Sequence, residues 1–77
     1  MNKLRREKLR KIIRDIEAYS EDLEYLCDEI KDDYNDLSEE LMESDEGEKM
    51  MEAADSIEEA YNCIENVVSY IEDAIDC

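Results

Sequence analysis

Apolar side chains recur every seven residues in both halves of the chain, and this repeat limits the fold more than any other feature. In the first half, one row is accompanied by a second row three residues further along. A seven-residue spacing keeps side chains on one face of an α-helix. The first half is therefore predicted to form one long amphipathic helix. Its two rows are Leu9, Ile16, Leu23, Ile30 and Leu37, and Ile12, Tyr19 and Leu26.

The second half repeats the pattern with three apolar rows. Three rows in seven make a wide apolar face, which is typical of a helix in a bundle. The 77 residues include no Pro and one Gly, a composition that favours long helices over sheets or loop-rich folds. The fold class is predicted to be all-α. The rows are Met50, Ile57, Ile64 and Ile71; Ala54, Tyr61, Val68 and Ile75; and Ala53, Ala60, Val67 and Ala74.

Helix-ending and helix-capping residues lie between the two halves. Asn35 and Asp36 can end a helix, and Ser44 or Asp45 can cap the next one, with Glu48 at a capping-box spacing from Asp45. We expect helix 1 at about 3–35, a connector at about 36–44 with room for one helical turn, and helix 2 at about 45–76. Two helices of matched length predict one antiparallel, coiled-coil-like hairpin over residues 1–77.

The pairing of the two helices follows from the position of the turn. With the turn near Glu40, residues whose numbers sum to about 80 face each other, for example Leu26 and Ala54. Two helices cannot cover a face three rows wide. We expect either a second copy, giving a homodimeric four-helix bundle, or a target protein to cover it, although repulsion between two chains of charge -16 opposes the dimer.

The composition argues against an enzyme. The chain is too short for several domains, it has no His, and its three cysteines, Cys27, Cys63 and Cys77, are far apart. This composition excludes zinc sites, Cys-His nucleophiles and histidine acid-base catalysis. The Asp-rich stretch DDYNDLSEE lacks the Gly and the final Glu of a calcium-binding loop. We expect no catalytic, cofactor-binding or metal-binding residues.

Cysteine usage and hydropathy indicate the compartment. No apolar run is long enough to cross a membrane, and the basic start lacks the apolar stretch of a signal peptide. An odd number of cysteines without CxxC spacing favours free thiols. The protein is expected to stay in the cytosol where it is made, away from membranes, with Cys27 and Cys63 as small residues at the helix flanks.

Charge is divided unequally along the chain. Residues 1–14 hold seven basic side chains and one acidic, a formal charge of +6, whereas residues 15–77 hold two basic and 24 acidic, a charge of -22. In an antiparallel hairpin, the basic start lies beside Glu72, Asp73 and Asp76. We expect these segments to clasp each other, which makes direct nucleic-acid binding by the basic segment the weaker alternative.

Acidic residues form stripes on the outer face of both helices. The charge density, roughly one carboxylate per 2 Å, is close to that of duplex DNA at about one charge per 1.7 Å. The stripes are either a solubilising surface or an imitation of phosphates. Tyr25 and Tyr70 lie outside the main apolar rows and either contact a partner or pack along their own helix. The stripes comprise Glu17, Glu21, Glu24, Asp28 and Asp32, and Glu48, Glu52, Asp55 and Glu59.

Residues 54–60, ADSIEEA, follow an acidic helix, a turn and a Ser-Glu-rich segment. In this order, residues 15–76 resemble small acidic helical-hairpin proteins encoded by phages and prophages of Gram-positive bacteria, although Ser38 stands where that group often has Pro. The resemblance implies a mobile-element origin and a helical hairpin, and assigns no activity. Small acidic phage proteins include anti-CRISPR and anti-restriction inhibitors, some of which mimic DNA.

These observations lead to two hypotheses about function. The first is a non-enzymatic, anti-CRISPR-type inhibitor whose acidic stripes occupy the nucleic-acid site of a host defence protein, such as a CRISPR-Cas effector. The second is a structural or adaptor hairpin that binds a partner through its apolar face. The first hypothesis requires strong dependence of binding on salt, and the second predicts weak dependence.

Overall fold

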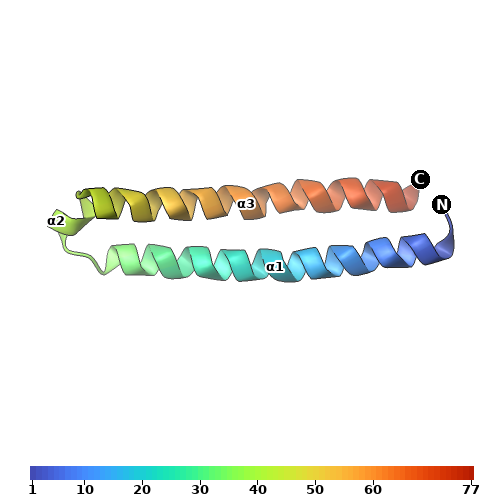
Figure 1. Ribbon diagram of the computed structural model, residues 1–77, viewed down its shortest axis with the longest axis horizontal. Coiled ribbons are helices and arrows are strands. Elements are labelled where there is room, and N and C mark those ends of the chain that lie inside the picture. Colours follow the sequence, from blue (N-terminus) through green and yellow to red (C-terminus); the bar gives the residue numbers. More distant parts are fainter.

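A computed structural model describes all 77 residues and is all-helical, with 90% of the residues in helices and no strand. Helix α1 spans Lys3–Asn35, the short α2 spans Glu39–Met42, and α3 spans Asp45–Asp76. Figure 1 shows α1 and α3 side by side and antiparallel, with both chain ends at one end of the rod and α2 at the other. The molecule is elongated, measuring 59 × 15 × 11 Å.

Local capping explains where the helices begin. The side chain of Asn2 accepts a hydrogen bond from the Arg5 amide at 2.9 Å, and Ser44 does the same for the Gly47 amide at 3.4 Å. Each cap satisfies a backbone N–H that has no partner within its helix. The long helices end at the residues expected from the sequence, and Ser44, rather than Asp45, caps α3.

The closest contact between α1 and α3 involves small side chains. Cys27 and Ala54 are both fully buried, and the Cys27 thiol donates a hydrogen bond to the Ala54 carbonyl oxygen at 3.3 Å. A small residue on each helix allows the backbones to approach. The placement of Cys27 at a helix flank was therefore wrong, because this thiol lies at the centre of the interface.

The contact face of α1 also differs from the expected one. The row Leu9, Ile16, Leu23 and Ile30 is half-buried as predicted, but its companion is the row that contains Ile13 and Cys27, not Ile12, Tyr19 and Leu26. Consequently, Cys27 lies against Ala54 in place of Leu26. Each helix can bury about two rows against a single neighbour, and α1 turns its smaller side chains inward.

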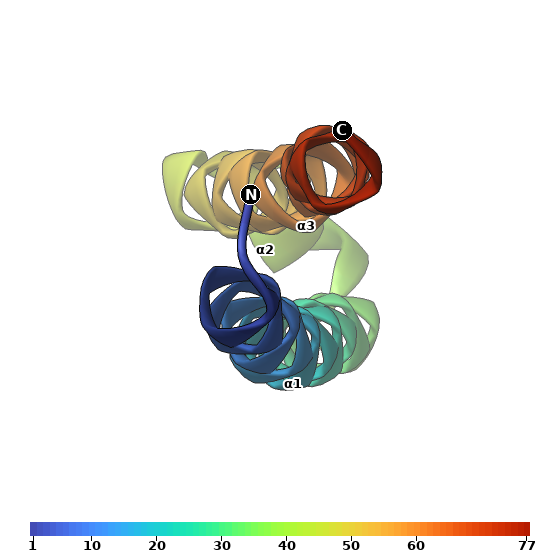
Figure 2. The same ribbon diagram turned by 90° about the vertical axis from the view of Figure 1, so that its right-hand side faces the viewer.

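The rows left over form an apolar strip, which we define as Ile12, Tyr19, Leu26, Ala53, Ala60 and Val67. Its large side chains are 46% exposed at Ile12, 68% at Tyr19, 48% at Leu26 and 44% at Val67. The chain has only two long helices, and the end-on view in Figure 2 shows α1 and α3 as a single pair with no further long helix beside it. Neither long helix contains a stretch apolar enough to cross a bilayer.

The connector is packed tightly against the start of α3. Gly47 is buried, and a Cβ at this position would collide with the carbonyl oxygens of Leu41 and Met42. Glycine is therefore required by close backbone approach rather than by an unusual dihedral angle, since its φ is not positive. The contact fixes α2 across the end of the rod.

Candidate functional site

One side of the hairpin collects acidic residues from both long helices. We call the half-buried rows that face the other helix the contact rows. In α1, the residue that follows each contact-row residue lies on one flank, as Glu17 and Glu24 do. The corresponding flank of α3 holds Glu58, Glu65 and Glu72. The Lys31–Glu58 ion pair joins these two flanks, so they face the same side of the rod. The apolar strip occupies the opposite flanks and therefore the opposite side.

The centre of this side is an open groove of about 300 Å³ between the helices. Glu17 and Glu21 of α1 and Glu65 of α3 line it, with Ser20, Ile64 and Val68 completing the lining. Together with Glu24 on the same flank of α1, these three carboxylates define what we call the acidic groove. None of the four forms an ion pair within the chain. Their negative charge is therefore available to a cationic partner.

Cations flank the acidic groove at both ends. Toward the connector, the Lys31 ammonium lies 3.5 Å from the Glu58 carboxylate, and both side chains remain partly exposed. Cys27 and Glu58 raise the pKa of Lys31. Burial of the neighbouring Tyr61 raises the pKa of its phenol, and Glu58 adds to this effect. This cluster neutralises one boundary of the groove and leaves its centre acidic.

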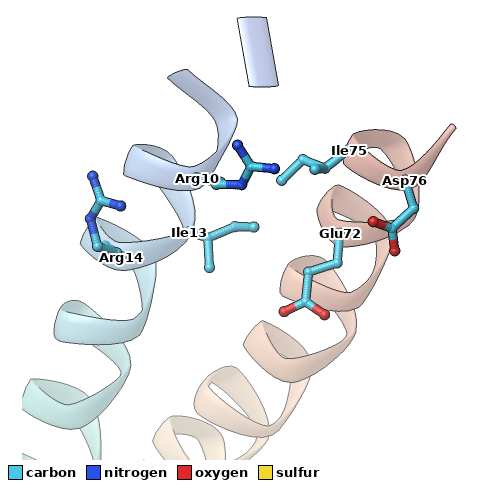
Figure 3. A pocket seen from close by; sticks show the side chains of 6 residues that line it. All are labelled: Arg10, Ile13, Arg14, Glu72, Ile75 and Asp76. Atoms are coloured by element: carbon cyan, nitrogen blue, oxygen red, sulfur yellow. The ribbon is translucent and has the colours of Figure 1, made fainter. Parts of the chain in front are cut away.

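At the other end of the groove, Arg10, Arg14, Glu72 and Asp76 surround Ile13 and Ile75. Figure 3 shows Arg10 reaching toward Ile75, while Arg14 points away from α3. The expected clasp of basic and acidic side chains is thus only partly present, because no ion pair links these groups. Instead, Arg6 donates hydrogen bonds to the carbonyl oxygens of Ile75 at 3.0 Å and Cys77 at 3.1 Å. This arginine satisfies carbonyls that a helix end leaves without partners.

The residues predicted from sequence do not form one continuous site. All of them are exposed. On α1, Glu17, Glu21, Glu24 and Asp28 lie on the groove side, whereas Asp32 and Tyr25 point outward. On α3, Glu52 and Glu59 point outward, whereas Glu48 and Asp55 follow the buried Gly47 and Ala54 and lie on the groove side, as Asp28 does on α1. Tyr70, 75% exposed, lies beside the apolar strip.

The partner-binding residues predicted from sequence do not include the three α3 acids on the groove side, Glu58, Glu65 and Glu72, of which only Glu72 was expected, as a neighbour of the basic start. Each directly follows a contact-row isoleucine, so the dipeptide Ile-Glu occurs three times at seven-residue intervals. An acidic residue immediately after a buried row lies at the edge of the helix contact. This repeated dipeptide was the available signal for a groove shared by both helices.

The Lys31, Glu58 and Tyr61 cluster predicts a loss of stability at alkaline pH. The pKa values of Lys31 and Tyr61 are raised in the folded state, so their contribution is complete below the unfolded pKa and disappears as pH rises through the folded pKa. The free energy of unfolding should therefore fall above about pH 10. Denaturant unfolding of wild type and Tyr61→Phe at mildly and strongly alkaline pH measures this effect.

The Tyr61→Phe variant should lose less stability than wild type over this pH change, because one of the two shifted groups is gone. Tyr25→Phe removes an exposed tyrosine outside the helix contact and should retain the wild-type dependence. Equal alkaline losses in all three proteins would contradict the role assigned to Tyr61.

No group of three or more His, Cys, Asp or Glu side chains is arranged to hold a metal ion. No protein-family model, curated protein or solved structure matches the chain. The resemblance to phage-encoded hairpins therefore stays a prediction. The groove, its unpaired carboxylates and the apolar strip behind it are the features on which a function can be built.

Proposed function

We propose that this protein is a non-enzymatic binding protein that occupies the positively charged nucleic-acid site of another protein. The observation that carries the proposal is the convergence of unpaired carboxylates from two helices on one side of a straight rod. Glu17, Glu21 and Glu65 line one groove there, and Glu24 extends it along α1. A protein site evolved for phosphates presents Lys and Arg side chains, which pair favourably with carboxylates held at regular spacing.

The overall charge supports the same proposal. With two basic residues against 24 acidic ones after residue 14, the rod carries far more negative charge than solubility requires. Like charges at helical spacing lower the stability of the free protein, and a cationic surface would relieve that repulsion. Inhibition of a host defence protein, of the anti-CRISPR type and in the bacterial cytoplasm, is the most concrete form of the proposal and derives from the resemblance to phage-encoded hairpins.

Self-association is the second part of the proposal. The apolar strip lies on the side of the hairpin away from the acidic groove, so a homodimeric four-helix bundle would leave the groove free. Burial of Ile12, Leu26 and Val67 supplies the hydrophobic driving force, at about 25 cal/mol for each Å² removed from water.

Affinity capture from a bacterial lysate tests the proposed binding. The immobilised protein should retain nucleic-acid-binding proteins, and added duplex DNA or RNA should elute them by competition. Retention should also weaken steeply as salt is raised, because the contacts are ionic. Captured proteins that resist both salt and nucleic acid, and that instead depend on the apolar strip, would favour the adaptor function.

A further inference from the structure

We infer that the apolar strip binds a second copy of this chain in the opposite direction, with the two-fold axis at the level of Tyr19 and Cys63. This inference rests on the proposed self-association and is independent of what the acidic groove binds. It follows from the order of residues in the exposed row of α1. That row reads Arg5, Ile12, Tyr19, Leu26 and Asp33, at seven-residue intervals.

The exposed row of α1 is complementary to itself when reversed. Tyr19 is the central residue of the Lys3–Asn35 helix. When a second copy is turned to run in the opposite direction about this point, Tyr19 of one copy faces Tyr19 of the other. Ile12 of one copy then faces Leu26 of the other. It also places the cation of Arg5 beside the carboxylate of Asp33, and symmetry makes this contact twice. In the neighbouring row, Lys8 of one copy comes within one residue of the level of Glu29 of the other, while Asp15 comes equally close to the level of Asp22.

The α3 side of the strip has a matching centre. Reversal about Cys63 places Ser56 level with Tyr70 of the second copy and Ala60 within one residue of the level of Val67. The Arg6–Ile75 and Cys27–Ala54 hydrogen bonds show that residues summing to 81 lie at one level of the hairpin. Tyr19 is therefore level with residue 62, adjacent to Cys63. The height of the two-fold axis is thus set by α1, and on α3 it falls beside the exposed Cys63.

Charge favours this direction over the alternative. The apolar strip contains no acidic residue. The row beside it on α3 also contains none, and consists of Lys49, Ser56, Cys63, Tyr70 and Cys77. Two hairpins pointing the same way would bring their basic first turns together and their acidic connectors together. Pointing in opposite directions, each basic end lies over the partner's acidic connector end, which reduces the repulsion between two chains of charge -16.

The arrangement presents two acidic grooves on opposite outer sides of one bundle. Small residues at Ala53, Ser56 and Ala60 allow the two α3 helices to approach closely, while the larger Ile12, Tyr19 and Leu26 fill the space between the α1 helices. Such a dimer can engage two cationic sites at once or a single elongated one.

Charge reversal at Arg5 and Asp33 tests the direction. These residues are 28 positions apart on one straight helix, about 42 Å, so any energetic coupling between them is intermolecular. Arg5→Asp and Asp33→Arg should each raise the dimer dissociation constant roughly 10-fold, since each creates two like-charge contacts per dimer. The double variant should return to within about threefold of wild type. Sedimentation equilibrium measures the constants, and circular dichroism checks that the helices are intact.

Cross-linking of the exposed cysteines tests the position of the axis. In Cys77→Ser, Cys63 is the only exposed thiol, and mild oxidation should join two copies through it. In Cys63→Ser, Cys77 is the remaining exposed thiol. The Cys77 residues of the two copies lie at opposite ends of the dimer, so oxidation should give no covalent dimer. A monomer at every concentration, equal cross-linking through both cysteines, or a double reversal no better than the single ones would overturn the inference. Neither experiment uses a target protein, so failure here leaves the proposed binding function untouched.

Discussion

Ala54→Asp is expected to unfold the hairpin at room temperature. Ala54 is fully buried, and the adjacent Cys27 thiol already donates its hydrogen bond to the Ala54 carbonyl oxygen, so the new carboxylate would have no donor to pair with. An unpaired buried charge costs several kcal/mol even after local relaxation. A 77-residue protein has a total stability of about 4 to 12 kcal/mol at typical values per residue. Far-UV circular dichroism during heating should show little or no cooperative transition.

Asn62→Asp is the matched control for this substitution. It adds the same single negative charge to α3, at an exposed position outside the helix contact. Its melting temperature should remain close to that of wild type, because exposed substitutions change stability by about 0.5 kcal/mol or less. If Ala54→Asp melted like Asn62→Asp, the Cys27–Ala54 contact would not be the centre of the fold.

The helices and their ends could be predicted because they depend on local features. The seven-residue rows set the helical period, and capping by Asn2 and Ser44 involves backbone groups only three residues away. No distant partner is needed to end α1 at Asn35 or to begin α3 at Asp45. Such signals are visible in a single sequence because the capping side chain and the backbone N–H that it satisfies lie within one helical turn of each other.

The choice of contact face could not be made from the same rows. Both Ile12 and Ile13 are apolar and adjacent, and either could face α3 without changing the helical pattern. The outcome depends on how closely the two backbones approach, which is determined jointly by Cys27 on one helix and Ala54 on the other. Packing of this kind is a property of the pair and carries no periodic signal in either helix.

The same limit explains the partial success with charged residues. The sequence indicated that the basic start and the acidic end of the chain lie together, and the antiparallel arrangement places them there. It did not indicate that Arg6 donates to the carbonyls of Ile75 and Cys77 instead of pairing with a carboxylate.

Neutralising the acidic groove should weaken target binding roughly 100-fold. The triple variant Glu17→Gln, Glu21→Gln and Glu65→Gln removes the three carboxylates that line the groove while keeping side-chain size and the ability to form helices. Loss of three charge-assisted contacts at about 1 kcal/mol each gives this factor. Titration calorimetry against a nucleic-acid-binding protein recovered by capture measures the affinity.

A second triple variant separates groove recognition from bulk attraction. Asp32→Asn, Glu52→Gln and Glu59→Gln change the net charge equally, from -16 to -13, but all three residues point outward, away from both the acidic groove and the apolar strip. If the groove imitates phosphates, this control should keep affinity within about threefold of wild type and should keep its steep salt dependence, whereas the groove variant should lose both. Equal loss in the two variants would show that the target responds to total charge, and unchanged binding in both would show that the contact is made through apolar side chains instead.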